Sequence, residues 1–210
     1  MQILITRTAE EIETAYQKLS AAAVLGCDTE TDSLSARNGK ILSVQFSDGD
    51  LAVLVPMSEG VELGKLAAIL ENPSITKIFH NAKFDLEFLR AGGGTVSNVF
   101  CTMIAEKVLT KGAGQSASLA ETLYRYFAVD LDKSQRTKFN RTWNGIWTKE
   151  LVEYALNDVV YLPRLMNEQK IWLKNLGLES NFADQLQKNC GENLYPYSGV
   201  TSGDTPDDLL

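Results

Sequence analysis

The stretch at residues 21–30, AAAVLGCDTE, decides the fold, because an apolar run passes directly into two carboxylates. Residues 21–27 predict a buried central strand that ends in the polar residues Asp28, Thr29 and Glu30. Alternate side chains of a strand point to the same face, so Asp28 and Glu30 can share a cation. An Asp-x-Glu pair alone is common on solvated surfaces, so it indicates a metal site only together with acids elsewhere in the chain.

The segments that follow predict a mixed sheet. Strands at residues 41–46 and 51–55 flank the turn-forming residues 47–50, so three antiparallel strands are expected. A helix at 63–70, a strand at 77–79, a helix at 82–90 and a strand at 96–100 then alternate, which implies parallel strands. The sequence therefore predicts an α/β domain with flanking helices, for which the ribonuclease-H-like arrangement is one candidate.

The remaining segments are mainly helical. A short helix at residues 8–20 comes first, and helices at 102–109, 119–127, 149–162 and 165–176 follow the strands, with Pro163 separating or kinking the last two. Apolar periodicity ends at about Leu178, and the end of the chain is rich in Gly, Pro, Ser and Asp. We therefore expect one domain over residues 1–177 and a flexible tail over 178–210.

Composition narrows the class of protein. The chain has 210 residues, of which 44% are hydrophobic and 22% charged, as expected for one globular domain. It has neither an apolar run of about 18 residues nor a secretory signal pattern, so we expect a soluble, cytoplasmic protein without membrane contacts. Three widely spaced cysteines predict free thiols. A net charge of -7 argues against a general nucleic-acid coat protein.

Two further segments supply acids that could join Asp28 and Glu30. Asp85 lies where a predicted strand gives way to a helix, although an exposed acid in a first helical turn is also common. Tyr154 and Asp158 are four residues apart and share one helical face. Apolar residues surround Asp158, so this carboxylate needs a partner or a metal.

Several carboxylates without His or Cys ligands select hard cations, so Mg²⁺ or Mn²⁺ is expected rather than zinc. The single histidine of the chain agrees with this expectation. Two such ions can activate a water molecule and stabilise the leaving oxygen of an in-line phosphoryl displacement. The residues therefore predict phosphodiester hydrolysis with two divalent metal ions.

Three motifs carry a family resemblance: DTETDSL at 28–34, HNAKFDLEFL at 80–89 and YALNDVVYL at 154–162. They resemble the exonuclease motifs of the DEDD (DnaQ-like) superfamily, in its tyrosine branch, which includes RNase D and the proofreading domain of DNA polymerase I. The resemblance covers about residues 20–176. It implies a ribonuclease-H-like fold, metal ligands at Asp28, Glu30, Asp85 and Asp158, and a Tyr154 hydroxyl that orients the attacking water.

The same resemblance implies substrate contacts. Asn81 would contact the backbone of the terminal nucleotide, Leu34 would wedge near the terminal bases, and Phe84 would stand near the site, with Thr29 and His80 beside them. His80 is not expected to be the general base, because the histidine branch has its His five residues before the last Asp, where Glu153 stands here. Its expected role is structural.

Residues 133–149 contain five cations and no acid, interleaved with Phe139, Trp143 and Trp147. The resemblance matches Lys133, Ser134 and Arg136 to a Lys-Ser and Arg pattern near the substrate. Lys133 and Arg136 are therefore expected to contact phosphates, and the aromatic rings could stack on bases. The alternative is a solvated loop with its aromatic side chains in the core.

The sequence thus predicts a metal-dependent 3′-5′ exonuclease that releases nucleoside 5′-monophosphates from single-stranded DNA, in proofreading, repair or degradation. The DTETDSL match favours DNA, and proofreading would require a DNA polymerase in trans or a longer chain of which this is a fragment. An RNase D-like exoribonuclease is the first alternative, since recognition of the 2′-hydroxyl cannot be inferred from sequence. A non-catalytic nucleic-acid-binding module is the second.

Overall fold

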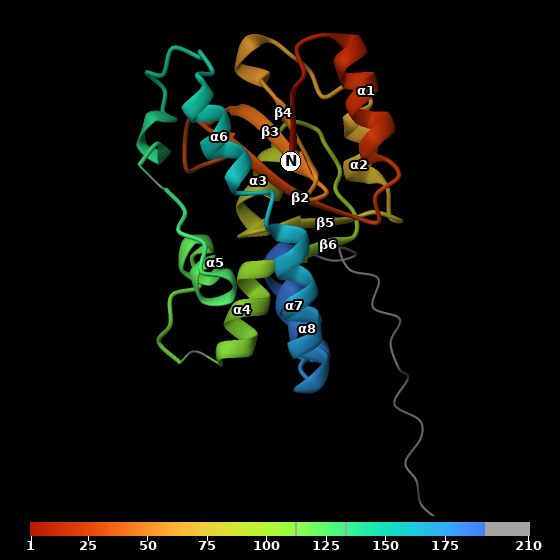
Figure 1. Cartoon of the computed structure of the whole chain (residues 1–210), viewed down its shortest axis with the longest axis vertical. Coiled ribbons are helices and arrows are strands. Elements are labelled where there is room, and N and C mark those ends of the chain that lie inside the picture. Colours follow the sequence, from red (N-terminus) through yellow and green to blue (C-terminus); the bar gives the residue numbers. More distant parts are fainter. Residues whose placement is uncertain (112, 133, 192–210) are drawn as a thin grey trace, which may run out of the picture.

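A single mixed sheet forms the centre of the computed structural model, which describes residues 1–111, 113–132 and 134–191 (Figure 1). Its strands run in the order β1-β4-β3-β2-β5-β6. Their bounds are β1 Gln2–Ile5, β2 Val24–Thr31, β3 Ile41–Ser47, β4 Leu51–Val55, β5 Thr76–Phe79 and β6 Val99–Cys101. Strand β3 pairs antiparallel with β2 and β4, whereas β2–β5, β5–β6 and β1–β4 are parallel pairs. The predicted mixed sheet is confirmed, with β1 as an additional edge strand.

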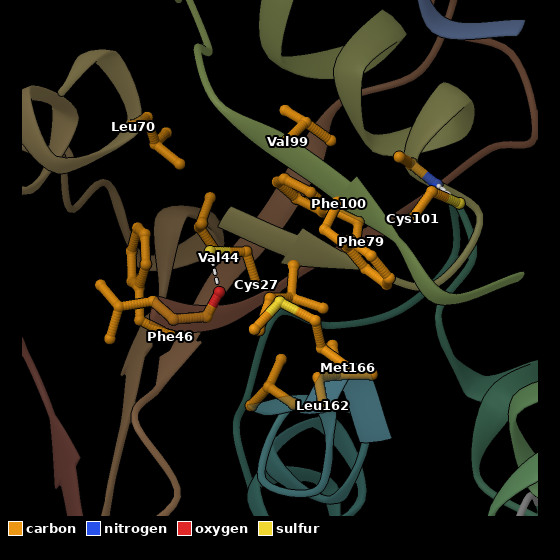
Figure 2. Packing of buried hydrophobic residues seen from close by; sticks show 14 of the residues in the cluster. Cys27, Val44, Phe46, Leu70, Phe79, Val99, Phe100, Cys101, Leu162 and Met166 are labelled. Atoms are coloured by element: carbon orange, nitrogen blue, oxygen red, sulfur yellow. Dashed lines mark hydrogen bonds between the residues drawn. The ribbon is translucent and has the colours of Figure 1, made fainter. Parts of the chain in front are cut away.

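Strand β2 is central because its apolar half is buried from both sides. Leu25 and Cys27 are fully buried, and Gly26 pairs with Ser47 of β3 and Ile78 of β5. Figure 2 shows this core, in which side chains of the central strands meet Leu162 and Met166 from the helix α7. The apolar half of β2 is therefore part of the core, and at its polar end the strand continues with partly buried Asp28 and Glu30 and buried Thr29.

Eight α-helices surround the sheet within the described residues. Their bounds are α1 Ala9–Leu19, α2 Leu66–Glu71, α3 Ala82–Ala91, α4 Thr102–Thr110, α5 Leu119–Phe127, α6 Lys149–Asn157, α7 Leu162–Asn175 and α8 Glu179–Cys190. Helix α6 packs on β3 and β4, and α7 packs on β2 and β5. Helices α4, α7 and α8 pack on one another and form a helical group below the sheet in Figure 1.

The long helix predicted for residues 149–162 is wrong in its extent. Helix α6 ends at Asn157, Asp158 is its C-cap, and α7 begins at Leu162. Pro163 explains the break, because a proline lacks the N–H that an uninterrupted helix would need and is well tolerated in a first helical turn. Asp158 nevertheless keeps a helical backbone, with φ -76° and ψ -15°. The predicted relation between Tyr154 and Asp158 therefore survives the break.

The predicted flexible tail is also wrong in its first part. Residues 179–190 form α8, whose side chains Phe182, Leu186 and Cys190 are buried against the helical group and the sheet. The Phe182 ring lies 4.6 Å from that of Phe100 in β6. The rest of the predicted tail, 192–210, lies outside the described residues.

In the part of the chain that the structure describes, no helix combines the length and the apolar character that a membrane span requires.

Candidate metal centre and catalytic cleft

A cleft of about 700 Å³ opens where β2 ends. We call it the catalytic cleft. Its walls come from β2 and the loop after it, from the first turns of α3 and α5, and from α6. Most of the residues predicted to act at the site line it: Asp28, Thr29, Glu30, Leu34, His80, Asn81, Phe84, Asp85, Tyr154 and Asp158. The structure thus brings together three sequence motifs, the first and last of which are more than a hundred residues apart.

Three carboxylates form a compact cluster in this cleft. Asp28, Glu30 and Asp158 each offer an oxygen, and these atoms lie within 4.8 Å of one another. All three side chains are partly buried, so water screens their mutual repulsion less than at an open surface. A hard divalent cation with oxygen ligands would neutralise this repulsion. The donor set therefore fits Mg²⁺ or Mn²⁺, as the sequence predicts.

Asp85 lies in the same cleft but in a different environment. Its side chain is 2% exposed, and its Oδ1 accepts hydrogen bonds from the Thr29 N–H at 3.0 Å and from the Thr29 hydroxyl at 2.7 Å. Burial raises the pKa of Asp85 to about 7, the hydrogen bonds from Thr29 oppose this rise, and the charge of Asp158 adds to it. Thr29 thus holds Asp85 in the wall of the cleft, near Asp158.

Gly26 determines how closely Asp158 can approach β2. A Cβ atom at Gly26 would lie 2.3 Å from the Val159 carbonyl oxygen and 3.1 Å from Cβ of Leu162. The chain segment directly after Asp158 therefore rests on the backbone of β2, two residues before Asp28. Only glycine permits this contact, so Gly26 belongs to the residues that assemble the site.

We expect Gly26→Ala to separate Asp158 from Asp28 and Glu30. The contact would be with backbone atoms, which cannot rotate away, so the free energy of unfolding should fall by about 1–3 kcal/mol. The affinity for Mg²⁺, measured by calorimetric titration, should fall at least about tenfold. Gly60→Ala is the matched control for loss of a glycine, because no atom lies near its Cβ position, although its φ of 81° adds some strain. Metal affinity equal to that of the wild type would contradict this role.

Tyr154 is 6% exposed and lies one helical turn before Asp158. Its ring lies 5.8 Å from that of Phe139, at an interplanar angle of 36°. Phe139 in turn packs on Trp143 and Trp147. This aromatic group restricts Tyr154, so its ring is held in place at the wall of the cleft.

The predicted substrate-contact residues occupy the rim and one wall. Leu34 is 86% exposed at the rim, and Phe84 is half-buried beside Phe88. Asn81 has a left-handed backbone, with φ 73° and ψ 46°, directly before α3. This conformation is uncommon for a residue other than glycine, and such residues concentrate at functional sites.

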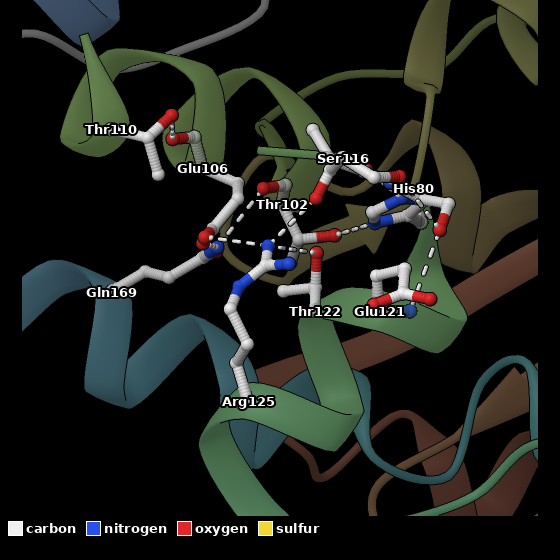
Figure 3. A network of polar contacts seen from close by, with 11 residues as sticks. His80, Thr102, Glu106, Thr110, Ser116, Glu121, Thr122, Arg125 and Gln169 are labelled. Carbon is white, nitrogen blue, oxygen red and sulfur yellow. Dashed lines mark hydrogen bonds and ion pairs between the residues drawn. The ribbon is translucent and has the colours of Figure 1, made fainter. Parts of the chain in front are cut away.

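His80 belongs to a polar network that supports one wall of the cleft (Figure 3). Its Nε2 lies 2.9 Å from the Ala117 carbonyl and its Nδ1 lies 2.8 Å from the Thr102 hydroxyl. A carbonyl can only accept, so Nε2 carries a proton. These contacts tie the loop before α5 to the end of β5, which agrees with the expected structural role of His80.

The same network fixes α5 on α4 and α7. Arg125 donates to Glu106 at 3.0 Å and to the Ser116 carbonyl at 2.8 Å, and Gln169 donates to Glu106 at 3.1 Å (Figure 3). Glu106 is 3% exposed, so its charge needs these partners. Sequence reasoning missed the wall that α5 provides, namely Ser118, Leu119 and Ala120. The signal available was the N-cap Ser118, which marks the start of α5 but not its position in space.

The segment at residues 133–149 is only partly as expected. Lys133 lies outside the described residues, and only the backbone of Arg136 is described, in the short 3-10 turn η2 Arg136–Lys138. Phe139 and Trp147 are each 8% exposed, and the Trp147 indole N–H donates to the Ser58 hydroxyl at 3.0 Å. Trp147 therefore packs in the protein and offers no face to a base, so the predicted stacking is wrong for this residue. Phe139 does line the cleft.

The fold and the site define a class: a ribonuclease-H-like α/β domain whose cleft gathers carboxylates from three sequence motifs. A family model described as "3'-5' exonuclease" matches residues 3–173. The chain belongs to this 3′-5′ exonuclease family. The predicted superfamily is thereby confirmed.

Similar sequences include ribonuclease D and DNA polymerase I. Ribonuclease D of Bartonella henselae is 32% identical over 77% of the chain and 39% of its own length, and DNA polymerase I of Aquifex aeolicus is 28% identical over 82% of the chain and 28% of its own length. The chain spans between 30% and 50% of the length of the first four curated relatives, all of them ribonuclease D.

A solved structure matches over nearly its whole length. NrnC of Brucella melitensis, bound to pGG, is 27% identical, with a TM-score of 0.73 and coverage of 89% of both chains. The same protein has been solved with bound Mg²⁺, with a TM-score of 0.72.

Proposed function

We propose that this chain is a metal-dependent exoribonuclease that removes nucleoside 5′-monophosphates from the 3′ ends of single-stranded RNA. The observation that carries the chemistry is the cluster of Asp28, Glu30 and Asp158 in an open cleft. The preference for RNA rests on the relatives, which are mainly named ribonuclease D. The DNA preference expected from the DTETDSL motif is not confirmed, so RNA takes its place.

The residues of the cleft fit the steps of such a hydrolysis. Asp28, Glu30 and Asp158 would hold one divalent cation, and Asp28 with Asp85 would support a second. Bound there, the cations would supply charge stabilisation for the attacking and leaving oxygens of the phosphodiester. The Tyr154 hydroxyl would orient the attacking water by a hydrogen bond, and the packing of its ring on Phe139 preorganises it. Leu34 and Phe84 would contact the terminal bases, and Asn81 the backbone.

A second candidate function is the cleavage of very short oligonucleotides. The match to NrnC bound to pGG covers 89% of both chains, whereas the ribonuclease D relatives are about twice as long as this chain or longer. A catalytic domain that matches this solved structure over 89% of both chains could act on fragments a few nucleotides long. Substrate length separates the two candidates.

The test uses two 5′-labelled single-stranded octamers of the same sequence, one of RNA and one of DNA, with Mg²⁺. We expect stepwise shortening of the RNA from its 3′ end and clearly slower shortening of the DNA. EDTA should abolish both reactions. Equal or faster shortening of the DNA would favour the hypothesis of a DNA substrate. If neither octamer nor an RNA dinucleotide is shortened, the proposed function is overturned.

A further inference from the structure

A second pocket lies beside the catalytic cleft. It has a volume of about 510 Å³ and lies between the first turn of α3, the length of α4 and one face of α8. We call it the lysine pocket after Lys83, Lys107 and Lys111. Asn81 and Met103 line both this pocket and the catalytic cleft, so the two hollows adjoin at the start of α3. Apart from Asn81, Ala82 and Lys83, which belong to the motif at 80–89, its lining residues lie outside the three motifs.

The two hollows have opposite charge. Five carboxylates line the catalytic cleft, and no lysine or arginine does so among the described residues. The lysine pocket has three lysines and, among the described residues, no Asp or Glu in its lining. This separation is marked in a chain whose net charge is -7. The carboxylates of the catalytic cleft repel the phosphates of a strand wherever no metal ion neutralises them. Cationic side chains that bind the strand must therefore lie next to the catalytic cleft.

The remaining lining of the lysine pocket is neutral and polar. Asn181, Gln185 and Asn189 follow one another at four-residue spacing, which places their amide groups along one face of α8. Lys107 lies in α4 and Lys111 is its C-cap residue, so two of the lysines come from α4 and the amides from α8, which packs against it. Lysine ammonium groups bind phosphates as point charges, and amide side chains can donate to phosphate, sugar or base.

We propose that the lysine pocket binds the phosphates of the substrate strand on the 5′ side of the bond that is cut. The strand would pass from the metal cluster, over the strained backbone at Asn81, to Lys83, Lys107 and Lys111. This inference rests on the proposed function. It predicts that strands long enough to reach the pocket bind more tightly than a dinucleotide does.

The test measures removal of the first nucleotide from an RNA octamer and from an RNA dinucleotide with Mg²⁺, at about 50 and 200 mM salt. For Lys107→Gln/Lys111→Gln we expect KM for the octamer to rise about tenfold, with little change in kcat. The slope of log(kcat/KM) against log salt should become shallower by about 1.4, because each lost lysine–phosphate contact contributes about 0.7 for a single strand. Lys18→Gln/Lys174→Gln removes two exposed lysines from α1 and α7 and should leave KM and slope unchanged.

Each other outcome has a distinct meaning. The wild type could cleave the octamer while Lys107→Gln/Lys111→Gln has the same KM and salt slope as the wild type. This result would overturn the role of the lysine pocket and leave the proposed function intact. If the wild type cleaves neither substrate, the proposed function fails. The affinity of each variant for a labelled octamer, measured by fluorescence anisotropy in EDTA, then shows whether the lysine pocket binds a strand. A pocket variant that binds the octamer normally but has lost affinity for AMP would show that the lysine pocket binds free nucleotides. It would overturn the proposal that the pocket binds the substrate strand.

Discussion

Asp28→Asn should reduce kcat/KM for removal of a 3′ nucleotide at least about a thousandfold. Asp28 belongs to the three-carboxylate cluster, and the proposed mechanism uses it as a ligand of both cations. Losing metal stabilisation of the transition state costs several kcal/mol, and about 4 kcal/mol corresponds to a thousandfold. The rate is measured in single-turnover assays with Mg²⁺, so that product release does not limit it.

A loss of activity must be separated from a loss of the fold. Ligand binding to the native state raises the melting temperature, so Mg²⁺ should raise that of the wild type and have little effect on Asp28→Asn. The metal-free variant should melt no lower than the metal-free wild type, because one of three mutually repelling charges is gone. Asp184→Asn removes an exposed acid on α8 and should keep full activity. An Asp28→Asn variant with wild-type activity would refute the metal cluster.

The sequence predicts this cluster because its signals are local. An apolar run that ends in alternating acids requires a buried strand with both carboxylates on one face, and β2 confirms it. The four-residue spacing of Tyr154 and Asp158 requires only a local helical backbone, which persists although α6 ends one residue earlier. What is encoded within about five residues can therefore be read from the sequence.

The missed features depend on contacts between distant segments. Strand β1 has four residues, exposed or half-exposed, and its place follows from pairing with β4, about fifty residues further on. Helix α8 carries Phe182, Leu186 and Cys190 at regular spacing, but it is followed by a Gly- and Pro-rich sequence that is typical of a flexible tail. Position 26 requires glycine because a Cβ atom there would collide with the backbone of Val159. The spacing within α8 is a local signal for that helix, whereas no local pattern indicates the pairing of β1 or the contact of Gly26.

Asp85 shows how tertiary structure changes the chemistry of a residue that the sequence identifies correctly. Its position in a first helical turn is typical of an exposed acid that the helix dipole stabilises. The structure instead buries it against Thr29, 56 residues away, and the burial raises its pKa to about 7. In the unfolded chain the same carboxyl has an ordinary pKa near 3.9. Its charge is therefore a cost to the folded, metal-free protein.

Asp85→Asn should accordingly stabilise the metal-free protein while it removes activity. Because folding raises the pKa of Asp85, this residue alone lowers the free energy of unfolding of the wild type as the pH rises from about 4 to about 7, and its contribution stays constant above that pH. Asparagine carries no charge and keeps an oxygen that can accept from Thr29. The metal-free variant should therefore be more stable by about 2–4 kcal/mol near pH 8, and it should lack this pH dependence.

Thermal melts in EDTA at pH values from about 4 to 8 measure this difference. For a chain of this size it corresponds to a rise in melting temperature of about 5–10 °C near pH 8, and the two proteins should converge near pH 4. Mg²⁺ should narrow the gap, since the cation stabilises the ionised form of Asp85 only in the wild type. A metal-free variant that melts below the wild type near pH 8 would show that Thr29 and its neighbours stabilise the ionised carboxylate. The ionised Asp85 would then raise the free energy of unfolding of the metal-free protein instead of lowering it.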